Sequence, residues 1–329
     1  MDSSQYALPG ETCNNAVLNK VLFYDLSRQT LSPGILTDFD AVAAFDRVIA
    51  GVSIATCQRV GLPRVAGYFM FHLLKQMKFH LITGFGQSST FYHNNVDGTV
   101  GHRVLQGCSS AAPIFILNSD VSLSAFKNKA HGASFSHPIN KTIITDFAIQ
   151  YVDDTSQYVN NTNSNEKHLE KTLSQASEKK QLWADLLWVS GGNLNLGKCY
   201  YYAFQPIVDF KRNTITCKNL DSQSPISITN PATGRPHSIC RTPPTTAQRA
   251  LGAIIAPSGD GTQQLLHSLQ CARELFGKFK ASKLPNIKQN GLQLLPPLNQ
   301  PISKHILQPA TAQSNQIHYF TNGMHGSRP

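Results

Sequence analysis

The sequence predicts an α+β fold in which helices cover an antiparallel sheet. Two stretches of strand-forming residues fold back around short turns, at 79–94 and 147–161, which is typical of hairpins. Two longer stretches, 165–190 and 262–282, repeat apolar residues at helical spacing. Apolar residues make up 41% of the 329 residues, enough for a core in one large domain or two ordinary ones.

The N-terminal half contributes one strand that carries acids. The stretch GILTDFD, at 34–40, alternates along its length, so Asp38 and Asp40 are expected on the same side. The elements predicted after it are a helix from 40 to the GLP stop at 61–63, a helix over 65–77, the hairpin at 79–94 and, beyond a Gly-rich loop, a helix at about 112–126.

The C-terminal half alternates strands with long helices. Its predicted elements are the hairpin at 147–161, a helix over 165–190 that ends at Gly191-Gly192, a strand at 198–204, a hairpin at 226–241, a strand at 249–257 and a helix over 262–282. Residues 286–329 are rich in Gln, Asn, Pro and Ser without a steady period, which predicts a disordered or poorly packed tail.

Charge and cysteine content narrow the function classes. The net charge of +10 suits a polyanionic partner such as nucleic acid, although an ordinary basic soluble protein has the same balance. No apolar stretch is long enough to span a bilayer, and the N-terminus does not read as a signal peptide. Seven scattered cysteines without a C-x-x-C spacing argue against structural zinc and disulfides. We expect an intracellular protein, with nucleus and cytoplasm both open.

Two adjacent acids, Asp153 and Asp154, lie at the tip of the hairpin FAIQYVDDTSQYVNN. With 14 aspartates in the chain, about 0.6 such pairs arise by chance, so the pair alone proves little. Together with Asp40 at a strand end, however, it would form a cluster of carboxylates. Such a cluster suits Mg²⁺, and two Mg²⁺ ions roughly 3.5–4 Å apart can clamp both oxygens of a phosphoryl transfer.

Several sequence blocks give the chain a family resemblance. Over residues 5–285 it resembles the catalytic domain of a reverse transcriptase of the non-LTR (LINE-type) retrotransposon kind. The blocks that carry the resemblance, in the family's order, are QYALPG (5–10), DAVAAFDRV (40–48), RVLQGCSSAAP (103–113), YVDD (151–154), GGNLNLGKC (191–199) and RALG (249–252). Any one of these blocks is weak evidence, whereas their order is specific.

The resemblance implies a right-hand polymerase fold. Its palm would be a βαββαβ unit, an antiparallel sheet backed by helices, with partial fingers and a partial thumb. The implied domains are a remnant of fingers at 1–33, the palm with its catalytic blocks and primer grip at 34–260, the start of a thumb helix at 261–285, and the tail at 286–329. The chain would be a piece of a longer retrotransposon polyprotein, with RNA template, DNA primer and dNTP as partners.

The resemblance also implies which residues act in catalysis. Asp40 and Asp153 would be the main ligands of two Mg²⁺ ions, or of Mn²⁺ in their place. Asp154 would lie beside them, and the main-chain carbonyl of Ala41 would add a contact. Lys198 would protonate or balance the leaving pyrophosphate. Asp38 is the alternative to Asp40, but only Asp40 is followed five residues later by an aromatic side chain.

The remaining site residues would contact nucleotide, primer and template. By resemblance, Phe45 lies beneath the sugar and disfavours a 2′-hydroxyl, and Gln106 and Gly107 lie against the incoming nucleotide. The alternative for Phe45 is simple packing in its helix. The proline of the Gln-Gly block departs from the family, since it comes one residue late, at 113. The residues implied at the primer and template are Tyr151, Leu251 and Gly252.

The sequence therefore predicts an RNA-directed DNA polymerase that works by two-metal nucleotidyl transfer. Two alternatives stay open. One is an inactive retrotransposon remnant that only binds nucleic acid, because the family's upstream basic residues that grip the triphosphate are not present in this chain. The other is an RNA polymerase, which an aromatic residue at position 45 disfavours.

Overall fold

The computed structural model describes residues 3–93, 110–137, 139–160, 166–218 and 225–281. The chain divides into two compact units, Met1–Leu269 and Gln270–Pro329. The first unit has a mixed α+β fold with a mostly antiparallel central sheet, which confirms the predicted α+β class and the antiparallel sheet. Within the described ranges, no helix has the length and apolar character needed to cross a membrane. The predicted tail at 286–329 lies outside the described residues.

The central sheet is built around the strand that leads to Asp40. Strand β1 (Gly34–Phe39) lies between β7 (Asp154–Asn160) and β8 (Tyr200–Asp209) and runs antiparallel to both. The path continues from β7 to β6 (Ala148–Tyr151) and from β8 to β12 (Cys240–Arg241), while β9 (Thr214–Lys218) also pairs with β8. Asp154 is therefore the first residue of a strand that neighbours β1, and Asp153 immediately precedes it.

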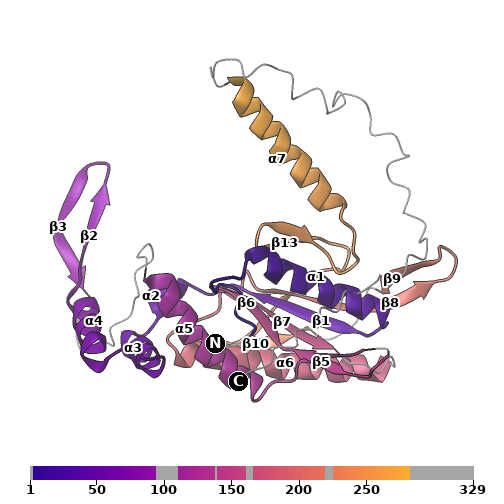
Figure 1. Cartoon of the computed structure of the whole chain (residues 1–329), viewed down its shortest axis with the longest axis horizontal. Coiled ribbons are helices and arrows are strands. Elements are labelled where there is room, and N and C mark those ends of the chain that lie inside the picture. Colours follow the sequence, from indigo (N-terminus) through magenta and orange to yellow (C-terminus); the bar gives the residue numbers. More distant parts are fainter. Residues whose placement is uncertain (1–2, 94–109, 138, 161–165, 219–224, 282–329) are drawn as a thin grey trace, which may run out of the picture. The chain divides into compact units, whose positions relative to one another are not determined.

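Helices cover both faces of this sheet (Figure 1). Helix α1 (Cys13–Gln29) packs on one face, whereas α5 (Ala111–Lys127) and α6 (Glu166–Val189) cover the other. The alternation of β1 divides its side chains accordingly: Ile35 joins the cluster under α6, and Leu36 joins the cluster under α1. The face under α1 is also the face on which Asp38 lies.

The other elements form smaller hairpins and helices. They are α2 (Ala44–Arg47), α3 (Ala50–Arg59), α4 (Arg64–Gln76), β2 (Lys78–Thr83), β3 (Gly86–His93), β4 (Ala133–Ser136), β5 (Ile143–Asp146), β10 (Ser227–Thr229), β11 (Pro236–Ser238), β13 (Gln248–Ala250), β14 (Ala253–Ile255) and α7 (Thr262–Ala281). The hairpins predicted at 79–94, 147–161 and 226–241, and the helices predicted over 65–77, 112–126, 165–190 and 262–282, all have counterparts among these elements.

Two predicted elements are wrong in detail. The single helix predicted from 40 to 60 is broken into α2 and α3, because the adjacent β-branched residues Val48 and Ile49 are both extended. The strand predicted at 249–257 is a hairpin, β13–β14. Its turn residues, Leu251 and Gly252, both have positive φ, at 49° and 94°, as a two-residue type I′ turn requires.

Helix α1 was missed because its apolar periodicity is weak, although it carries an N-terminal capping signal. The side chain of Thr12 accepts a hydrogen bond from the backbone N–H of Asn15, at 3.2 Å. The buried face of α1 contains Phe23 and Tyr24, which pack against Tyr158 and Phe204 of the sheet. Helix α1 therefore shares a hydrophobic core with the central sheet and supports it.

A buried lysine under the sheet should make stability depend on pH. Lys180 of α6 is fully buried, its Nζ has no hydrogen-bond partner among the described residues, and burial lowers its pKa to about 7. The unfolded chain then binds more protons than the folded chain between about pH 7 and the ordinary lysine pKa. Lys180 should therefore make stability rise with pH, by up to about 1.4 kcal/mol per unit.

Urea denaturation at pH 7 and pH 8.5 would test this expectation against Lys180→Met. The wild type should gain stability over this interval, and the variant should be more stable at pH 7 and lose much of the pH dependence. An identical pH dependence in both proteins would mean that Lys180 is not the group that titrates.

Candidate active site

Asp40 follows β1, and a second segment holds its backbone in place. The backbone N–H of Asn195 donates to the carbonyl of Asp40 at 2.8 Å, and that of Val42 donates to the carbonyl of Asn193 at 2.8 Å. Ala41 and Leu194 form an isolated antiparallel bridge between these bonds. The block at 191–199 thus fixes the position of Asp40.

Two glycines, Gly191 and Gly192, allow the chain at the end of α6 to pack closely against the segment that follows Asp40. Gly191 donates to the carbonyl of Trp188 and Gly192 donates to that of Leu187, which is the Schellman pattern of a helix C-terminus. Gly191 has φ 94°, and a Cβ there would lie 2.4 Å from the carbonyl oxygen of Arg47. The turn therefore requires glycine for its conformation and for the close contact.

Gly191→Ala should destabilise the protein by more than the 1–2 kcal/mol or so that the left-handed conformation alone costs, because the new methyl also meets a backbone oxygen. Gly10→Ala is the matched control, since Gly10 has φ 91° and an added Cβ would meet nothing within 4 Å. Urea denaturation should rank Gly191→Ala as clearly the less stable variant. Equal losses would show that the contact with Arg47 is unimportant.

The hairpin tip that carries the two other acids is a tight and strained turn. Tyr151 pairs directly with Asp154, which leaves Val152 and Asp153 as a two-residue loop. Val152 has φ 56°, while Asp153 does not share this left-handed geometry, as in a type II′ turn. A β-branched residue at positive φ is a genuine outlier, and such strain concentrates at functional sites.

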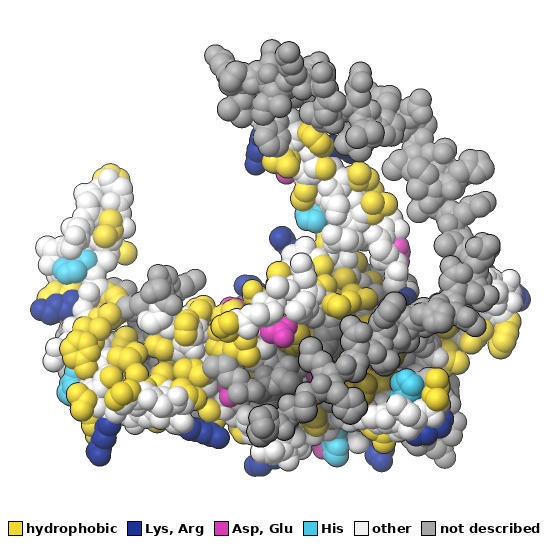
Figure 2. Space-filling view, viewed as in Figure 1, with side chains coloured by type: hydrophobic (Ala, Val, Ile, Leu, Met, Phe, Trp, Pro, Cys, Tyr) yellow, Lys and Arg dark blue, Asp and Glu magenta, His cyan; other side chains and the backbone are white. Residues whose placement is uncertain are grey.

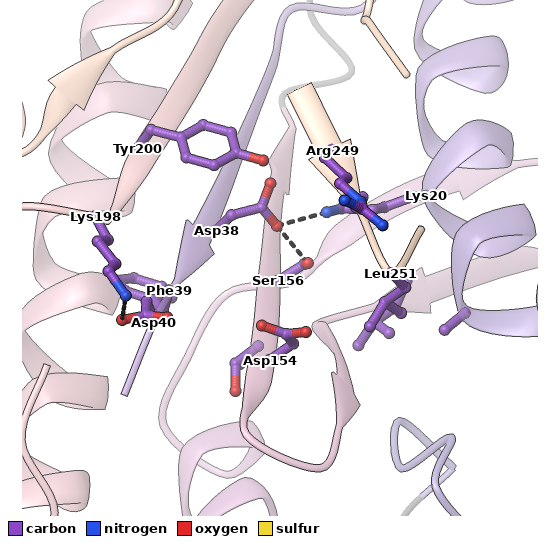
Figure 3. A pocket seen from close by; sticks show the side chains of 14 residues that line it. Lys20, Asp38, Phe39, Asp40, Asp154, Ser156, Lys198, Tyr200, Arg249 and Leu251 are labelled. Atoms are coloured by element: carbon purple, nitrogen blue, oxygen red, sulfur yellow. Dashed lines mark hydrogen bonds and ion pairs between the residues drawn. The ribbon is translucent and has the colours of Figure 1, made fainter. Parts of the chain in front are cut away.

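A cavity of about 230 Å³ joins Asp40 to this hairpin (Figure 3). Asp40 and Asp154 both line it, from the end of β1 and the start of β7. Lys198 and Leu251 line it too, the latter from the turn between β13 and β14. The structure thus brings together four predicted site residues from four separate sequence blocks.

Asp153 lies on the other side of the hairpin tip. It lines a smaller cavity together with Ala41, and Phe39 and Thr155 contribute to both cavities. Asp154, the first residue of β7, lines the larger cavity, whereas Asp153, in the turn before it, lines only the smaller one. The two hairpin acids are therefore close in sequence, but they do not open into one cavity.

The two candidate acids of β1 differ in accessibility. The Oδ1 atom of Asp38 accepts hydrogen bonds from Lys20 Nζ, at 2.6 Å, and from the hydroxyl of Ser156. Side chains of both members of the Lys20–Asp38 pair are largely buried, at 6% and 14% exposed, whereas Asp40 is 38% exposed. Asp38 is thus held by the protein itself, and Asp40 is the acid that is more open to a ligand.

Acidic and basic side chains both line the cavity: Asp38, Asp40 and Asp154 on one hand, and Lys20, Lys198 and Arg249 on the other. Burial raises the pKa of Asp154 above its ordinary value, and Asp153, Asp38 and Asp40 raise it further, whereas Lys20 lowers it. Lys198 Nζ lies 3.7 Å from Oδ2 of Asp40, but its side chain is 69% exposed, so this pair is held weakly.

This charge pattern bears on whether a divalent cation would fit. Carboxylate oxygens are the ligands that Mg²⁺ prefers, and a cation would offset both the burial and the repulsion from neighbouring acids that raise the pKa of Asp154. Among the described residues, however, no group of three or more His, Cys, Asp or Glu side chains is arranged to hold a metal ion. The donor chemistry fits, but a complete set of acidic ligands is not assembled.

The other predicted site residues lie at varied places. Phe45 packs on Phe115 of α5, with ring centroids 5.3 Å apart, and it lines neither cavity described above. Tyr151 ends β6, and Gly252 completes the β13–β14 turn next to Leu251. Gln106 and Gly107 lie outside the described residues.

Sequence reasoning missed several residues that form the wall of the cavity. Lys20, Ser156, Tyr200 and Arg249 all line it. Strand register brings Ser156 and Tyr200 next to Asp38, because Asp38 pairs with Ser156 of β7 on one side and with Tyr200 of β8 on the other. Burial raises the pKa of Tyr200 well above its usual value, and the neighbouring Asp38 raises it further. The alternation of side chains along each strand could have predicted which face of the sheet Ser156 and Tyr200 occupy. It could not have predicted that both residues pair with Asp38.

Comparison with known proteins identifies similar structures. The structure of telomerase from Candida tropicalis in complex with a TWJ fragment of telomeric RNA is 15% identical, with a TM-score of 0.38 over 67% of this chain and 34% of that chain. Apo telomerase from Candida tropicalis, truncated from its C-terminal domain, is 14% identical, with a TM-score of 0.40 over 71% and 41%.

Telomerase from Candida albicans, in complex with the same kind of fragment, is 12% identical, with a TM-score of 0.35 over 80% of this chain and 38% of that chain. The present chain thus spans well under half the length of these proteins. No family model and no curated protein sequence matches the chain. Similarity at this level carries no functional argument.

Proposed function

We propose that this chain is the polymerase domain of an RNA-directed DNA polymerase, a nucleotidyltransferase that extends a primer with dNTP. One observation supports it most strongly: Asp40 at the end of β1 and Asp154 at the YVDD hairpin line one cavity with the β13–β14 turn. These three segments are the blocks that the family resemblance assigns to catalysis and to the primer grip. Their convergence is what a polymerase active site requires.

The order of elements supports a right-hand palm. The four neighbouring strands of the central sheet and the two helices on one face occur along the chain as β1, α5, β6, β7, α6 and β8, a βαββαβ order into which the hairpins β2–β3 and β4–β5 and helices α2 to α4 are inserted, and the sheet order is β8-β1-β7-β6. In this proposal residues 1–33 are a remnant of the fingers, residues 34–260 form the palm, and α7 begins the thumb. The whole protein would be a longer retrotransposon product of the non-LTR kind.

The acidic residues of the site would bind metal, and Lys198 would act on the leaving group. Asp40, Asp153 and Asp154, with the carbonyl of Ala41, would hold the two Mg²⁺ ions, or Mn²⁺ in their place. Such ions supply charge stabilisation for an in-line displacement at phosphorus. Lys198, beside Asp40, would offset charge on the departing pyrophosphate.

The protein's other contribution would be positioning. Leu251 and Gly252 would hold the primer end over the cavity, with Tyr151 beside it, and Gln106 and Gly107 would meet the incoming nucleotide. Phe45 would act in sugar selection if its ring reaches the nucleotide, and its packing on Phe115 gives that ring a fixed support. The partners of the reaction would be an RNA template, a DNA primer and dNTP.

An inactive remnant that only binds nucleic acid is a second candidate. It is favoured by the position of Asp153, which lines a separate cavity from Asp40 and Asp154. Catalysis through all three acids would need the hairpin tip to rearrange when substrate binds.

Primer extension on an RNA template separates these functions. The expected result is Mg²⁺-dependent incorporation of dNTP, but not of NTP, by the wild type, and loss of incorporation in Asp153→Asn with unchanged template binding. Binding without incorporation would favour the remnant, and incorporation of NTP would favour an RNA polymerase. Full activity of Asp153→Asn would exclude the assigned role of that residue.

A further inference from the structure

A second small cavity, called the inner cavity below, lies between β6 and the helices α5 and α6. Its volume is about 20 Å³, and Phe115, Trp183 and Leu187 contribute apolar side chains to its wall. Hydrophobic side chains also gather over α3, α4 and α5 on the face of the molecule shown in Figure 2. The residues that line both the inner cavity and the cavity of Asp153 are Ala41, Phe115, Gln150, Trp183 and Leu187. The inner cavity is thus an apolar space directly beside the candidate active site.

Two amide groups in this apolar wall each have an oxygen atom without a partner. Oδ1 of Asn118 and Oε1 of Gln150 are buried and accept no hydrogen bond from the described residues. Both residues line the inner cavity, and they are only 7% and 2% exposed. A buried acceptor that stays unsatisfied loses its hydration without compensation, so such atoms normally have a partner.

The neighbours of each amide determine which of its two end atoms is the oxygen. Nε2 of Gln150 donates to the carbonyl of Val152 at 3.0 Å, which an oxygen in that place could not do. Nδ2 of Asn118 donates to Oγ of Ser53 at 2.7 Å, and Ser53 donates its own proton to the carbonyl of Ile49. Exchanging oxygen and nitrogen in either amide would place one acceptor against another. The two oxygens therefore remain the atoms that need a donor.

The hydroxyl groups in the wall do not supply these donors. Ser119 and Ser190 each donate to a backbone carbonyl three residues earlier, at 2.9 and 2.7 Å. Ser122 donates to a carbonyl of its own helix, at 3.4 Å. The described wall therefore presents acceptors to the inner cavity, and its ligand must bring hydrogen-bond donors.

We propose that the inner cavity binds one water molecule, which donates to Oδ1 of Asn118 and to Oε1 of Gln150. Its volume of about 20 Å³ exceeds the 10–15 Å³ or so that a water needs, and the two protons of water match the two oxygens. An organic donor is too large for this volume. An ammonium or alkali ion would be a buried charge without an acidic side chain among the described wall residues, which is costly.

The bound water would link α5 to the tip of the YVDD hairpin. The same amide of Gln150 that accepts from the water donates to the carbonyl of Val152, the residue with φ 56° at the tip. Asn118 would then be a positioning residue, which acts on the tip through the water and Gln150. This effect on the metal site rests on the proposed function, whereas the water site itself does not.

A crystal structure of the full chain tests the water site directly. The expected result is one water within about 3.2 Å of both Asn118 Oδ1 and Gln150 Oε1. A water that contacts only one of these oxygens, an inner cavity without density, or a protein side chain inside it would overturn the proposal.

Ser122→Val tests the water site in solution, because the larger side chain takes up part of the inner cavity. Displacing the water leaves two buried oxygens unsatisfied, so the unfolding equilibrium constant should rise at least about fivefold above that of Ser124→Val. Ser124→Val is the matched control, since it makes the same change in α5 outside the wall. A cavity without water would gain contacts from the added methyl groups, so a Ser122→Val protein as stable as the control would refute the site.

The Mg²⁺ dependence of primer extension tests the link to the hairpin tip. Ser122→Val should raise the Mg²⁺ concentration for half-maximal rate by on the order of tenfold, because groups that support metal ligands have effects of this size. Ser124→Val should leave that concentration unchanged. A loss of folded enzyme alone would lower the rate without shifting this concentration.

Failure of the water site can be told apart from failure of the polymerase assignment. A wild-type protein that incorporates no nucleotide would contradict the polymerase, and the crystal structure and the stability of Ser122→Val would still decide the water site. A bridging water together with an unchanged Mg²⁺ dependence in Ser122→Val would contradict only the positioning role of Asn118.

Discussion

Asp40→Asn should reduce nucleotide incorporation by on the order of 100-fold or more, the scale on which active sites lose rate when one electrostatic group is removed. Asp40 is 38% exposed, and its link to Asn195 is a hydrogen bond that its backbone carbonyl accepts from the Asn195 N–H. The substitution therefore removes a carboxylate that faces the cavity without removing a contact that the fold needs. Primer extension measures the rate, and urea denaturation should give a midpoint near that of the wild type.

Asp185→Asn is the matched control for Asp40→Asn. Asp185 lies on the exposed side of α6, so this variant removes the same charge and keeps the same shape away from the cavity. Its incorporation rate should stay within about twofold of the wild-type rate. Retained activity in Asp40→Asn, or an equal loss in both variants, would contradict the assignment of Asp40.

Lys20→Met should have the largest effect on stability, a loss of about 3–5 kcal/mol, because it leaves the buried carboxylate of Asp38 without its cation. Lys20 Nζ is 2.6 Å from Asp38 Oδ1, and the side chains are 6% and 14% exposed. Since Asp38 also accepts from Ser156, the pair ties α1 to β1 and β7, next to both cavity acids. Urea denaturation measures the loss directly.

The double variant Lys20→Met/Asp38→Leu provides the internal control. Replacing both charges with apolar side chains of similar size should recover much of the loss, because no unpaired buried charge remains. A loss of less than about 1 kcal/mol in the single variant, as in exposed ion pairs, would mean that the pair does not hold the wall of the cavity.

Local patterns were sufficient to predict most of the sheet and the helices that cover it. The strand at 34–39 and the hairpin around Asp153-Asp154 follow from alternation and turn chemistry, which act over a few residues. The break between α2 and α3 did not follow, because the helix-forming alanines around it masked Val48 and Ile49. Helix α1 was not predicted, because the apolar residues along it are irregularly spaced.

The candidate site was predictable only in part, because its composition depends on strand register. Sequence blocks identified Asp40, Asp154 and Leu251, which the fold then brings to one cavity. Nothing local indicates that Lys20, on a separate helix, reaches Asp38, or that Asp153 and Asp154 line different cavities. These features arise from long-range pairing, which sequence periodicity does not encode.

In the proposed enzyme, Asp40 and the tip of the YVDD hairpin take part in one site for divalent cations. Fe²⁺ with ascorbate and peroxide cleaves a protein backbone beside the bound ion, and mass spectrometry identifies the cleaved segments. We predict cleavage both near residue 40 and near residues 153–154, with excess Mg²⁺ suppressing both. Cleavage at one of these segments alone, or cleavage that Mg²⁺ does not suppress, would contradict a shared site.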